Sequence, residues 1–329
     1  MPSIHRRQFL QISAAAALAP TLPACSAEQV VIDTSLPVGP FGAKSTAEEV
    51  TEGLDLSGKT ALVTGCNSGI GYETMRVLAR RGAHVIGTGR TLERARDACE
   101  SVNGRTTPAE LELSDFDSVV ACAESVRSLD TPIDMLICNA GMLLRELQQV
   151  NGLEIQFVVN HLGHFLFVNR LLDQVLAAPQ GRVAVVSSIA HSNAPDGGIQ
   201  FGNLSGEGWA REAYGHSKLA NGLFSLELAG RLEGTEATSN SLHPGVIRET
   251  NIARNLPAAM GSVQSMSGKT IPEGAATTCY VATYPELTGV SGLYFDDCNA
   301  VAPGGYMEDR AMALRLWEVS EELTRDFLG

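Results

Sequence analysis

The feature that most constrains the fold is a regular alternation of short apolar runs with helical patterns. The apolar runs lack polar alternation, which is expected for parallel strands that helices cover on both faces. The expected strands are residues 60–64, 84–88, 108–113, 134–138, 182–187, 238–242 and 292–295. The expected helices are residues 69–81, 92–102, 116–129, 155–177 and 214–232. The pattern predicts one doubly wound α/β domain with a parallel seven-stranded sheet.

Residues 1–27 are typical of an export signal. Arg6 and Arg7 precede an alanine-rich apolar stretch that is too short to span a bilayer comfortably as a helix. The arginine pair followed by Phe-Leu resembles a twin-arginine signal, whose route carries folded proteins. Cys25 ends a sequence similar to a lipoprotein cleavage box, so lipidation there and ordinary cleavage nearby both stay open. We expect a periplasmic or membrane-anchored protein; the alternative is a cytoplasmic protein with a chance arginine pair.

The segment between the signal and the α/β domain is short and irregular. Residues 28–56 contain several prolines and glycines, which predicts a linker. Ser45 and Glu48 form a capping-box pattern, which predicts a short helix at the end of this linker. The α/β domain is then expected at 57–329, without a composition break that would separate a second domain.

Composition argues against several classes of partner and site. The formal net charge is −13, and such an acidic chain is a poor partner for nucleic acid. The seven cysteines form no CxxC pair and several fall in apolar patterns, which favours buried free thiols over a disulfide framework. Free thiols agree with folding in a reducing cytoplasm before export. The histidines have no metal-ligand spacing, so no metal is expected.

A glycine-rich turn follows the first expected strand and leads directly into the first long helix. Its glycines permit a tight turn and let the backbone approach a pyrophosphate, whose charge the free N–H groups of the helix start stabilise. A lone turn of this kind would be only a connector, but the strand and helix around it predict a dinucleotide site. The expected contacts are Gly65, Asn67, Ser68, Gly69, Ile70 and Gly71.

The end of the second strand indicates which dinucleotide the site takes. An acid at this place binds the ribose 2′-hydroxyl of NAD(H), whereas a base binds the 2′-phosphate of NADP(H). The strand ends in Gly87-Thr88-Gly89-Arg90, with one arginine and no acid. NADP(H) is therefore favoured over NAD(H), with Arg90 as the only charge that argues for the phosphate.

Tyr214 and Lys218 are four residues apart at the start of an expected helix, so their side chains share one face. A tyrosine has an ordinary pKa of about 10, so it needs a neighbouring positive charge to act as an acid or base near neutral pH. Lys218, together with an oxidised nicotinamide ring, would supply that charge. The spacing alone is weak evidence, because chance helices carry it often.

Six segments occur in the order and spacing of the short-chain dehydrogenase/reductase family, over about residues 57 to 320. They are the glycine turn from Thr64 to Gly71, Cys138-Asn139-Ala140-Gly141, Asn160, Ser187-Ser188, Tyr214 with Lys218, and Pro244-Gly245. Residues 160–165, 214–221 and 316–320 resemble the retinol dehydrogenase and WW-domain oxidoreductase branch. Protochlorophyllide reductase has a similar but more distant pattern. The resemblance implies a Rossmann fold and pairing of chains into dimers or tetramers.

The resemblance also implies a role for each matched residue. Tyr214 would be the general acid/base, Lys218 would lower its pKa and hold the nicotinamide ribose, and Ser188 would bind the substrate oxygen. Asn160 would hold a water that relays protons to Lys218. The remaining cofactor contacts would be Asn139, Ala140 and Gly141 on the adenosine side, Glu112 where the family usually has Asp, Leu113 through its backbone, and Pro244, Gly245 and Val246 beside the nicotinamide.

These roles imply an NADP(H)-dependent oxidoreductase that transfers a hydride to or from a carbonyl or alcohol of a medium to large apolar substrate. Two alternatives stay open. One is reduction of a carbon–carbon double bond, as in the protochlorophyllide type; the other is a non-catalytic dinucleotide-binding protein. Residues 197–211 and 251–270 are longer irregular stretches and the expected walls of the substrate pocket.

Overall fold

A computed structural model describes residues 39–209, 211–248, 252 and 268–329. These residues belong to one compact unit, which confirms the single α/β domain. The signal at Arg6 and Arg7, the lipidation site Cys25 and most of the linker lie outside the described residues. So does nearly all of the irregular stretch at 251–267.

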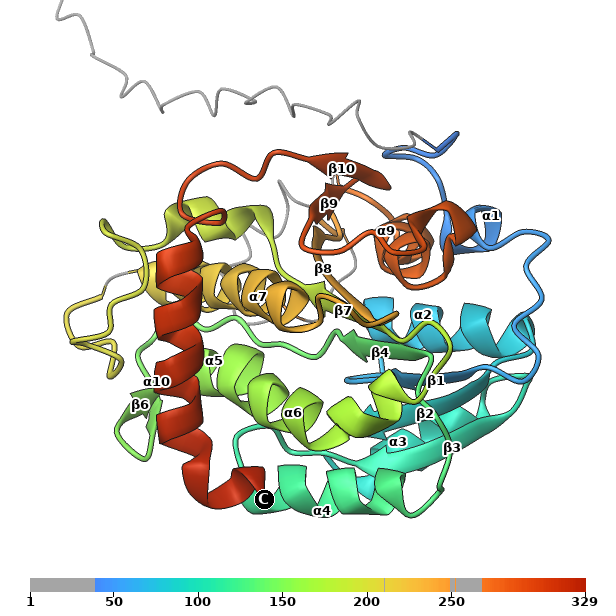
Figure 1. The fold of residues 1–329 in the computed structure, drawn as a ribbon, viewed down its shortest axis with the longest axis horizontal. Helices are drawn as coiled ribbons and strands as arrows, with labels where there is room; N and C mark the ends of the chain where they lie inside the picture. Colours follow the sequence, from blue (N-terminus) through green and yellow to red (C-terminus); the bar gives the residue numbers. More distant parts are fainter. Residues whose placement is uncertain (1–38, 210, 249–251, 253–267) are drawn as a thin grey trace, which may run out of the picture. The chain divides into compact units, whose positions relative to one another are not determined.

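The central sheet has eight strands in the order β10-β9-β8-β7-β4-β1-β2-β3 (Figure 1). The seven strands from β3 to β9 in this order are parallel, as expected, and β10 adds an antiparallel edge that the sequence did not predict. The strands are β1 Thr60–Val63, β2 His84–Gly89, β3 Thr106–Glu110, β4 Met135–Cys138, β7 Arg182–Val186, β8 Thr238–His243, β9 Tyr294–Asp296 and β10 Asn299–Val301. A separate hairpin pairs β5 Gln149–Val150 with β6 Leu153–Glu154.

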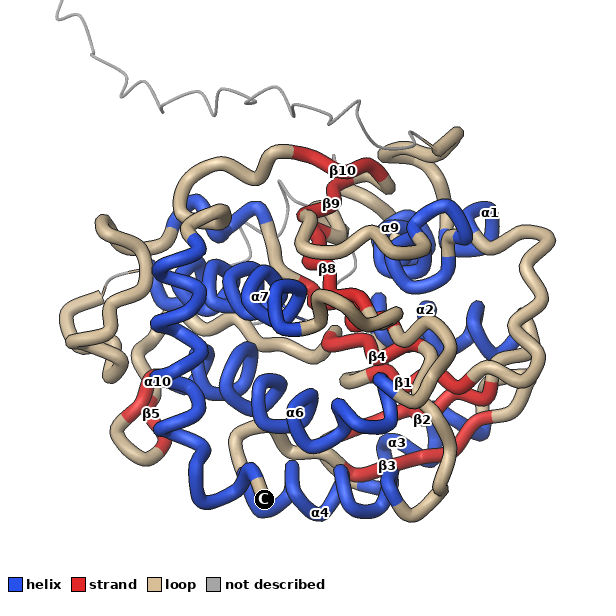
Figure 2. The backbone as a smooth tube through the Cα atoms, viewed as in Figure 1, coloured by secondary structure: helices blue, strands red, loops and turns tan. Residues whose placement is uncertain are grey.

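Helices cover both faces of the sheet (Figure 2). Alternate residues of β1 enter different cores: Ala61 and Val63 pack on one face and Leu62 on the other. The first face is covered by α1 Ala47–Val50, α2 Gly69–Arg80, α3 Leu92–Glu100 and α9 Ile271–Thr283. The second is covered by α4 Phe116–Arg127, α6 Gly163–Leu176, α7 Glu212–Arg231 and α10 Arg310–Leu328. Short turns of helix complete the set: α5 Ile155–Phe157, the π-helix η1 Val158–Leu162, η2 Ile189–Asn193 and η4 Pro285–Leu287.

The strand order places a ligand site beside β1. From β1 the chain proceeds to β2 and β3 on one side, and then crosses to β4, β7, β8 and β9 on the other. In open parallel sheets the crevice at such a reversal, beyond the carboxyl ends of the strands, is where ligands bind. The segments that follow β1, β4, β7 and β8 carry the glycine turn, Asn139, Ser188 and Pro244, so all of these meet at the same edge.

The cap of the first helix differs from the expected one. Thr46 caps α1 and Glu49 completes the capping box, one residue beyond the expected Ser45 and Glu48. Glu48 is instead engaged by three arginines at the end of α2, through contacts of 2.8 to 3.1 Å with Arg76, Arg80 and Arg81. The linker helix is thereby fixed to the domain.

The helix that bears Tyr214 is covered on its outer side. Trp317 of α10 packs against Phe224 of α7 and Phe165 of α6, with ring centroids 5.9 and 4.9 Å apart. The Arg231 guanidinium lies 4.1 Å from the centre of the same indole ring. Figure 1 shows α10 running across α6 and α7. Pairing of two chains through this face of α7 would therefore have to displace α10.

Candidate active site

The glycine turn joins β1 to α2 in the conformation that a phosphate site requires. Gly65 and Gly69 have positive φ of 70° and 60°, which favours glycine. Ser68 is the N-cap residue of α2 but makes no side-chain cap hydrogen bond. The first N–H groups of a 12-residue helix are therefore not capped by that side chain, which suits an anionic ligand.

Gly71 has no room for a side chain. A Cβ at this position would stand 2.3 Å from the carbonyl oxygen of Gly65 and 2.4 Å from Nδ2 of Asn139. The Gly65 carbonyl group is part of the turn itself. Asn139 supports the turn, because its Nδ2 donates to the carbonyl oxygen of Thr64 at 2.8 Å. A side chain at 71 would displace the turn from its support.

Gly71→Ala is expected to weaken NADPH binding by about one to two orders of magnitude, because the overpacked turn must shift. Isothermal titration calorimetry measures the change. Gly230→Ala is the matched control, since a Cβ at Gly230 meets nothing within 4 Å. Wild-type affinity in Gly71→Ala would show that the turn does not hold the dinucleotide.

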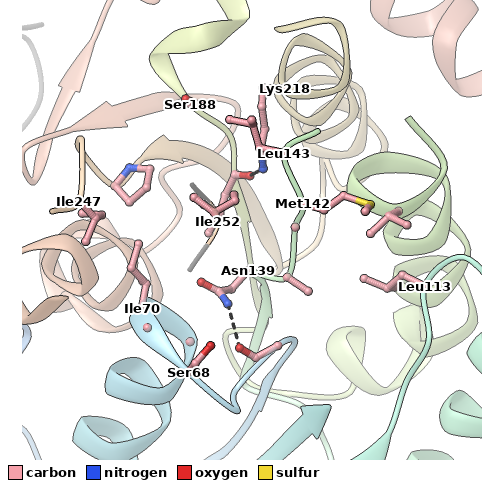
Figure 3. A pocket seen from close by; sticks show the side chains of 18 of the residues that line it. Ser68, Ile70, Leu113, Asn139, Met142, Leu143, Ser188, Lys218, Ile247 and Ile252 are labelled. Atoms are coloured by element: carbon pink, nitrogen blue, oxygen red, sulfur yellow. Dashed lines mark hydrogen bonds between the residues drawn. The ribbon is translucent and has the colours of Figure 1, made fainter. Parts of the chain in front are cut away.

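The loop after β4 is tied directly to the end of β1. The backbone N–H groups of Asn139 and Ala140 both donate to Thr64 Oγ1, each at 2.9 Å. A Cβ at Gly141 would stand 3.2 Å from Asn160 Oδ1 and 3.5 Å from Lys218 Nζ. This loop therefore runs between the glycine turn and the proton-transfer residues. Figure 3 shows Asn139 between Ser68 of the turn and Lys218 of α7.

The segment that follows β2 brings two arginines to the cavity. Arg90 and Arg94 both line the cavity, and both are exposed. Sequence reasoning missed Arg94, which lies in the first turn of α3, four residues after Arg90. The Glu112 carboxylate accepts hydrogen bonds from Ser114 N–H and Oγ at 3.1 and 2.7 Å, so the loop itself already uses one of its oxygens.

Tyr214, Ser188 and Lys218 come together on one wall of the cavity. Lys218 Nζ lies 5.7 Å from the centre of the Tyr214 ring and donates to the carbonyl oxygen of Val186 at 2.9 Å. Burial raises the pKa of Tyr214 to about 12, while a hydrogen bond from Ser188 acts in the opposite direction. Burial lowers the pKa of Lys218 to about 8. Burial therefore favours the neutral form of both side chains. The charge of a bound ligand would act on pKa values that burial has already shifted.

Asn160 lies behind the cavity rather than on its wall. It belongs to the π-helix η1, a local widening that is frequent at functional sites. Its Nδ2 donates to Ser217 Oγ at 2.9 Å and to the carbonyl oxygen of Met142 at 3.0 Å. Its Oδ1 accepts from the N–H of Met142 at 2.8 Å. Asn160 thus ties the loop after β4 to α7, and its part in a water relay stays a prediction.

The cavity has a volume of about 640 Å³ and joins the two halves of the site. Every residue expected to contact the cofactor lines it, as do three of the four expected catalytic residues: Gly65, Asn67, Ser68, Gly69, Ile70, Gly71, Arg90, Glu112, Leu113, Asn139, Ala140, Gly141, Ser188, Tyr214, Lys218, Pro244, Gly245 and Val246. The glycine turn and the tyrosine–lysine pair therefore share one space, although about 150 residues separate them.

One part of the cavity wall is apolar. Sequence reasoning missed most of these residues, which flank the recognised motifs by one to six positions: Met142, Leu143, Ile155, Val159, Ile189, Ile247 and Ile252. Ile189 and Val246 are about half exposed, at 55% and 48%. Ile252 lies in the expected wall at 251–270, but none of residues 197–209 or 211 lines the cavity, so that expectation is wrong for the described cavity. Such a wall suits a substrate with a large apolar part.

Within 39–209, 211–248, 252 and 268–329, no group of three His, Cys, Asp or Glu is arranged to hold a metal ion. No helix in the same ranges is long and apolar enough to cross a membrane. The six cysteines in the described part of the chain are free and buried.

Comparisons with known proteins agree with this geometry. The family model of short chain dehydrogenases matches residues 59–261, and that of the twin-arginine translocation signal matches residues 3–23, which supports export. The chain is 42% identical to short-chain dehydrogenase TIC 32 B of Brassica napus, covering 86% of this chain and 94% of the relative.

Other relatives carry the names of the expected branch. Identity is 39% to the WW domain-containing oxidoreductase of Gallus gallus, over 88% of this chain and 73% of the relative. It is 38% to retinol dehydrogenase 12 of Mus musculus, over 83% and 88%. A crystal structure of an uncharacterised protein from Mycobacterium paratuberculosis matches with a TM-score of 0.66 and 32% identity, over 84% of this chain and 97% of the other. The chain therefore belongs to the short-chain dehydrogenase/reductase family, in its retinol dehydrogenase and WW domain-containing oxidoreductase branch.

Proposed function

We propose that the chain is an NADP(H)-dependent oxidoreductase that reduces a carbonyl, or oxidises an alcohol, on a medium to large apolar substrate. The observation that carries this proposal is the shared cavity, in which Ser188, Tyr214 and Lys218 face the same space as the glycine turn. The apolar wall that includes Ile189 supports an apolar substrate. Turnover with a panel of aldehydes, ketones, alcohols and enones, in light and dark, tests it. Turnover of enones alone would favour the carbon–carbon double-bond reductase.

The chain's own residues fit a dinucleotide. The uncapped start of α2 and the close approach at Gly71 form a cradle for a phosphate. Hydride transfer is the chemistry that a nicotinamide supplies when it is bound. Ser188 would hold the substrate oxygen by a hydrogen bond, and Tyr214 would give it a proton in reduction or take one in oxidation. Lys218 would stabilise the resulting tyrosinate by its positive charge.

NADP(H) is the proposed cofactor because two arginines, and no acid, follow β2 at the cavity wall. Arg90→Ala with Arg94→Ala is expected to lower NADPH affinity by at least about tenfold and to leave NADH affinity within about twofold, because only NADPH carries the 2′-phosphate. Calorimetry with both dinucleotides measures this. Arg96→Ala, an exposed arginine of α3 outside the cavity wall, is the control. Tighter binding of NADH than of NADPH by the wild type would refute the preference.

The twin-arginine route carries folded proteins and would allow the dinucleotide to leave already bound, so we propose export of the loaded enzyme. We propose a signal peptide at 1–27, a linker with a short helix at 28–56 and the catalytic domain at 57–329. Mass spectrometry of the mature protein distinguishes an acylated Cys25 from cleavage nearby. An exported form purified without nucleotide would contradict export of the loaded enzyme.

A dimer or tetramer is the proposed assembly, as the resemblance implies. Since α10 covers α7 through Trp317, pairing should use a face that leaves this contact in place. Light scattering of the mature protein measures the mass, and a monomer at all concentrations would contradict the proposal.

A further inference from the structure

His164 connects the glycine turn to the π-helix that holds Asn160. It is 1% exposed and lies in the first turn of α6. Its Nε2 is 2.9 Å from Thr64 Oγ1, at the end of β1. Its Nδ1 is 3.1 Å from the main-chain carbonyl oxygen of Asn160. The mechanism proposed above does not use this side chain.

The hydrogen bonds around Thr64 determine which nitrogen of His164 carries the proton. Thr64 Oγ1 already accepts from the N–H groups of Asn139 and Ala140, each at 2.9 Å, so both of its lone pairs are used. Its own proton must therefore be donated, and His164 Nε2 at 2.9 Å is nearer than the carbonyl oxygen of Ile137 at 3.4 Å. Nε2 thus accepts, and the Nδ1–H group donates to the Asn160 carbonyl oxygen.

The neutral form of His164 is maintained by its surroundings. Burial lowers its pKa to about 4, and the nearby Lys218 charge acts in the same direction, against the bond to Asn160. A doubly protonated ring would place a third donor on Thr64 Oγ1, which has no lone pair left for it. At neutral pH the ring is therefore a two-ended connector with one fixed tautomer.

The connection continues from Asn160 to the catalytic helix. Asn160 Nδ2 donates to Ser217 Oγ at 2.9 Å, and Ser217 Oγ donates to the main-chain carbonyl oxygen of Tyr214 at 2.8 Å. An unbroken series of hydrogen-bonded residues thus runs from Thr64, below the glycine turn, through His164 to the first turn of α7. All of its members except Tyr214 are buried, which shields their bonds from competition with water.

We propose that His164 is a positioning residue that couples the dinucleotide turn to the proton-transfer site. Its Nε2 end fixes Thr64 and with it the loop at Asn139, whereas its Nδ1 end fixes the carbonyl group of Asn160. The proposal rests on the proposed function, because the second end matters for turnover only if Tyr214 and Lys218 transfer protons.

Two substitutions separate the two ends. In His164→Gln the terminal amide can take the place of Nε2 and keep the bond to Thr64, but the bond to Asn160 is lost. In His164→Asn the amide can take the place of Nδ1 and keep the bond to Asn160, but the bond to Thr64 is lost. Each variant thus removes one of the two hydrogen bonds and keeps a polar group that can form the other one.

The expected result is a split between binding and turnover. His164→Gln should bind NADPH within about twofold of the wild type and lose about tenfold in kcat, the effect of one hydrogen bond. His164→Asn should lose about tenfold in NADPH affinity and keep kcat at saturating cofactor within about threefold. Kd from calorimetry and kcat per correctly folded molecule are the measurements.

His161→Asn is the matched control. His161 is also 1% exposed and lies in the π-helix that holds Asn160, but its Nε2 is 2.8 Å from Ser320 Oγ of α10, away from the site. Loss of the His161 ring should lower the free energy of unfolding and leave both Kd and kcat within about twofold of the wild-type values. Any change in His164 variants beyond this control therefore reports on the site and not on burial alone.

Three outcomes would overturn the proposal: wild-type Kd and kcat in both His164 variants, equal losses of both parameters in both variants, or a split in the opposite sense. A wild type that binds NADPH but turns over no substrate would refute the proposed function instead. In that case the Kd values still decide on His164, because His164→Asn alone should weaken NADPH binding.

Discussion

Tyr214→Phe is expected to lower kcat by about three orders of magnitude while NADPH affinity stays within about twofold. The hydroxyl group is the only part that the substitution removes, and proton transfer by a positioned side chain contributes about 10²–10⁴ to a rate. The ring itself, which lines the cavity, remains to pack against the ligand. Steady-state kinetics on the best substrate of the panel and calorimetry with NADPH measure the two quantities.

Tyr72→Phe is the matched control for this substitution. Tyr72 lies in α2 and its hydroxyl is 2.9 Å from Ser101 Oγ at an exposed position. It should keep kcat within about twofold. Turnover by Tyr214→Phe at more than about a tenth of the wild-type rate would show that another group moves the proton.

Lys218→Met is expected to abolish most turnover and yet to stabilise the apoprotein near neutral pH. Burial keeps the pKa of Tyr214 at about 12 even against the opposing hydrogen bond from Ser188, so without the ammonium charge kcat should fall by at least about 10²-fold. Lys218 is 2% exposed, and methionine fills a similar volume without a buried charge. Lys44→Met, at a side chain that is 78% exposed, is the control.

The pH dependence of this stabilisation has a definite sign. The folded-state pKa of Lys218 is about 8, below its unfolded value of about 10.5. Between these pH values the unfolded chain binds more protons than the folded one, so wild-type stability rises with pH relative to Lys218→Met. The variant should be more stable by about 3 kcal/mol below pH 8, and the difference should vanish as the pH approaches 10.5. Urea unfolding at several pH values measures it. Equal stability at pH 7 would contradict a buried charged amine.

The sequence was sufficient for the seven parallel strands and for the motif residues that line the cavity. The apolar runs from Thr60 to Tyr294 are strands because both faces are covered, so no polar alternation masks them. The motif residues lie at the carboxyl ends of those strands, where parallel topology brings them together. What the sequence could not supply depends on side-chain direction and on contacts between distant segments.

The helix cap illustrates this limit. Ser45 with Glu48 and Thr46 with Glu49 have the same capping spacing, one residue apart. Only the folded chain decides between them, because the arginines of α2 engage Glu48 and leave Glu49 to complete the box.

The site shows the same limit. Asn160 was expected in the site but points to Ser217 behind the cavity wall, and Arg94 was not expected but lines the cavity. Each outcome depends on how a helix is turned about its axis.

Transfer of label from the cofactor tests the central claim most directly. NADPH deuterated stereospecifically at C4 of the nicotinamide is incubated with the mature protein and the carbonyl panel, and the alcohol product is analysed by mass spectrometry. We expect deuterium from one of the two C4 positions on the carbinol carbon with the wild type, and no labelled alcohol above background with Tyr214→Phe. A wild type that binds NADPH but forms no deuterated alcohol from any carbonyl would contradict the proposed hydride transfer.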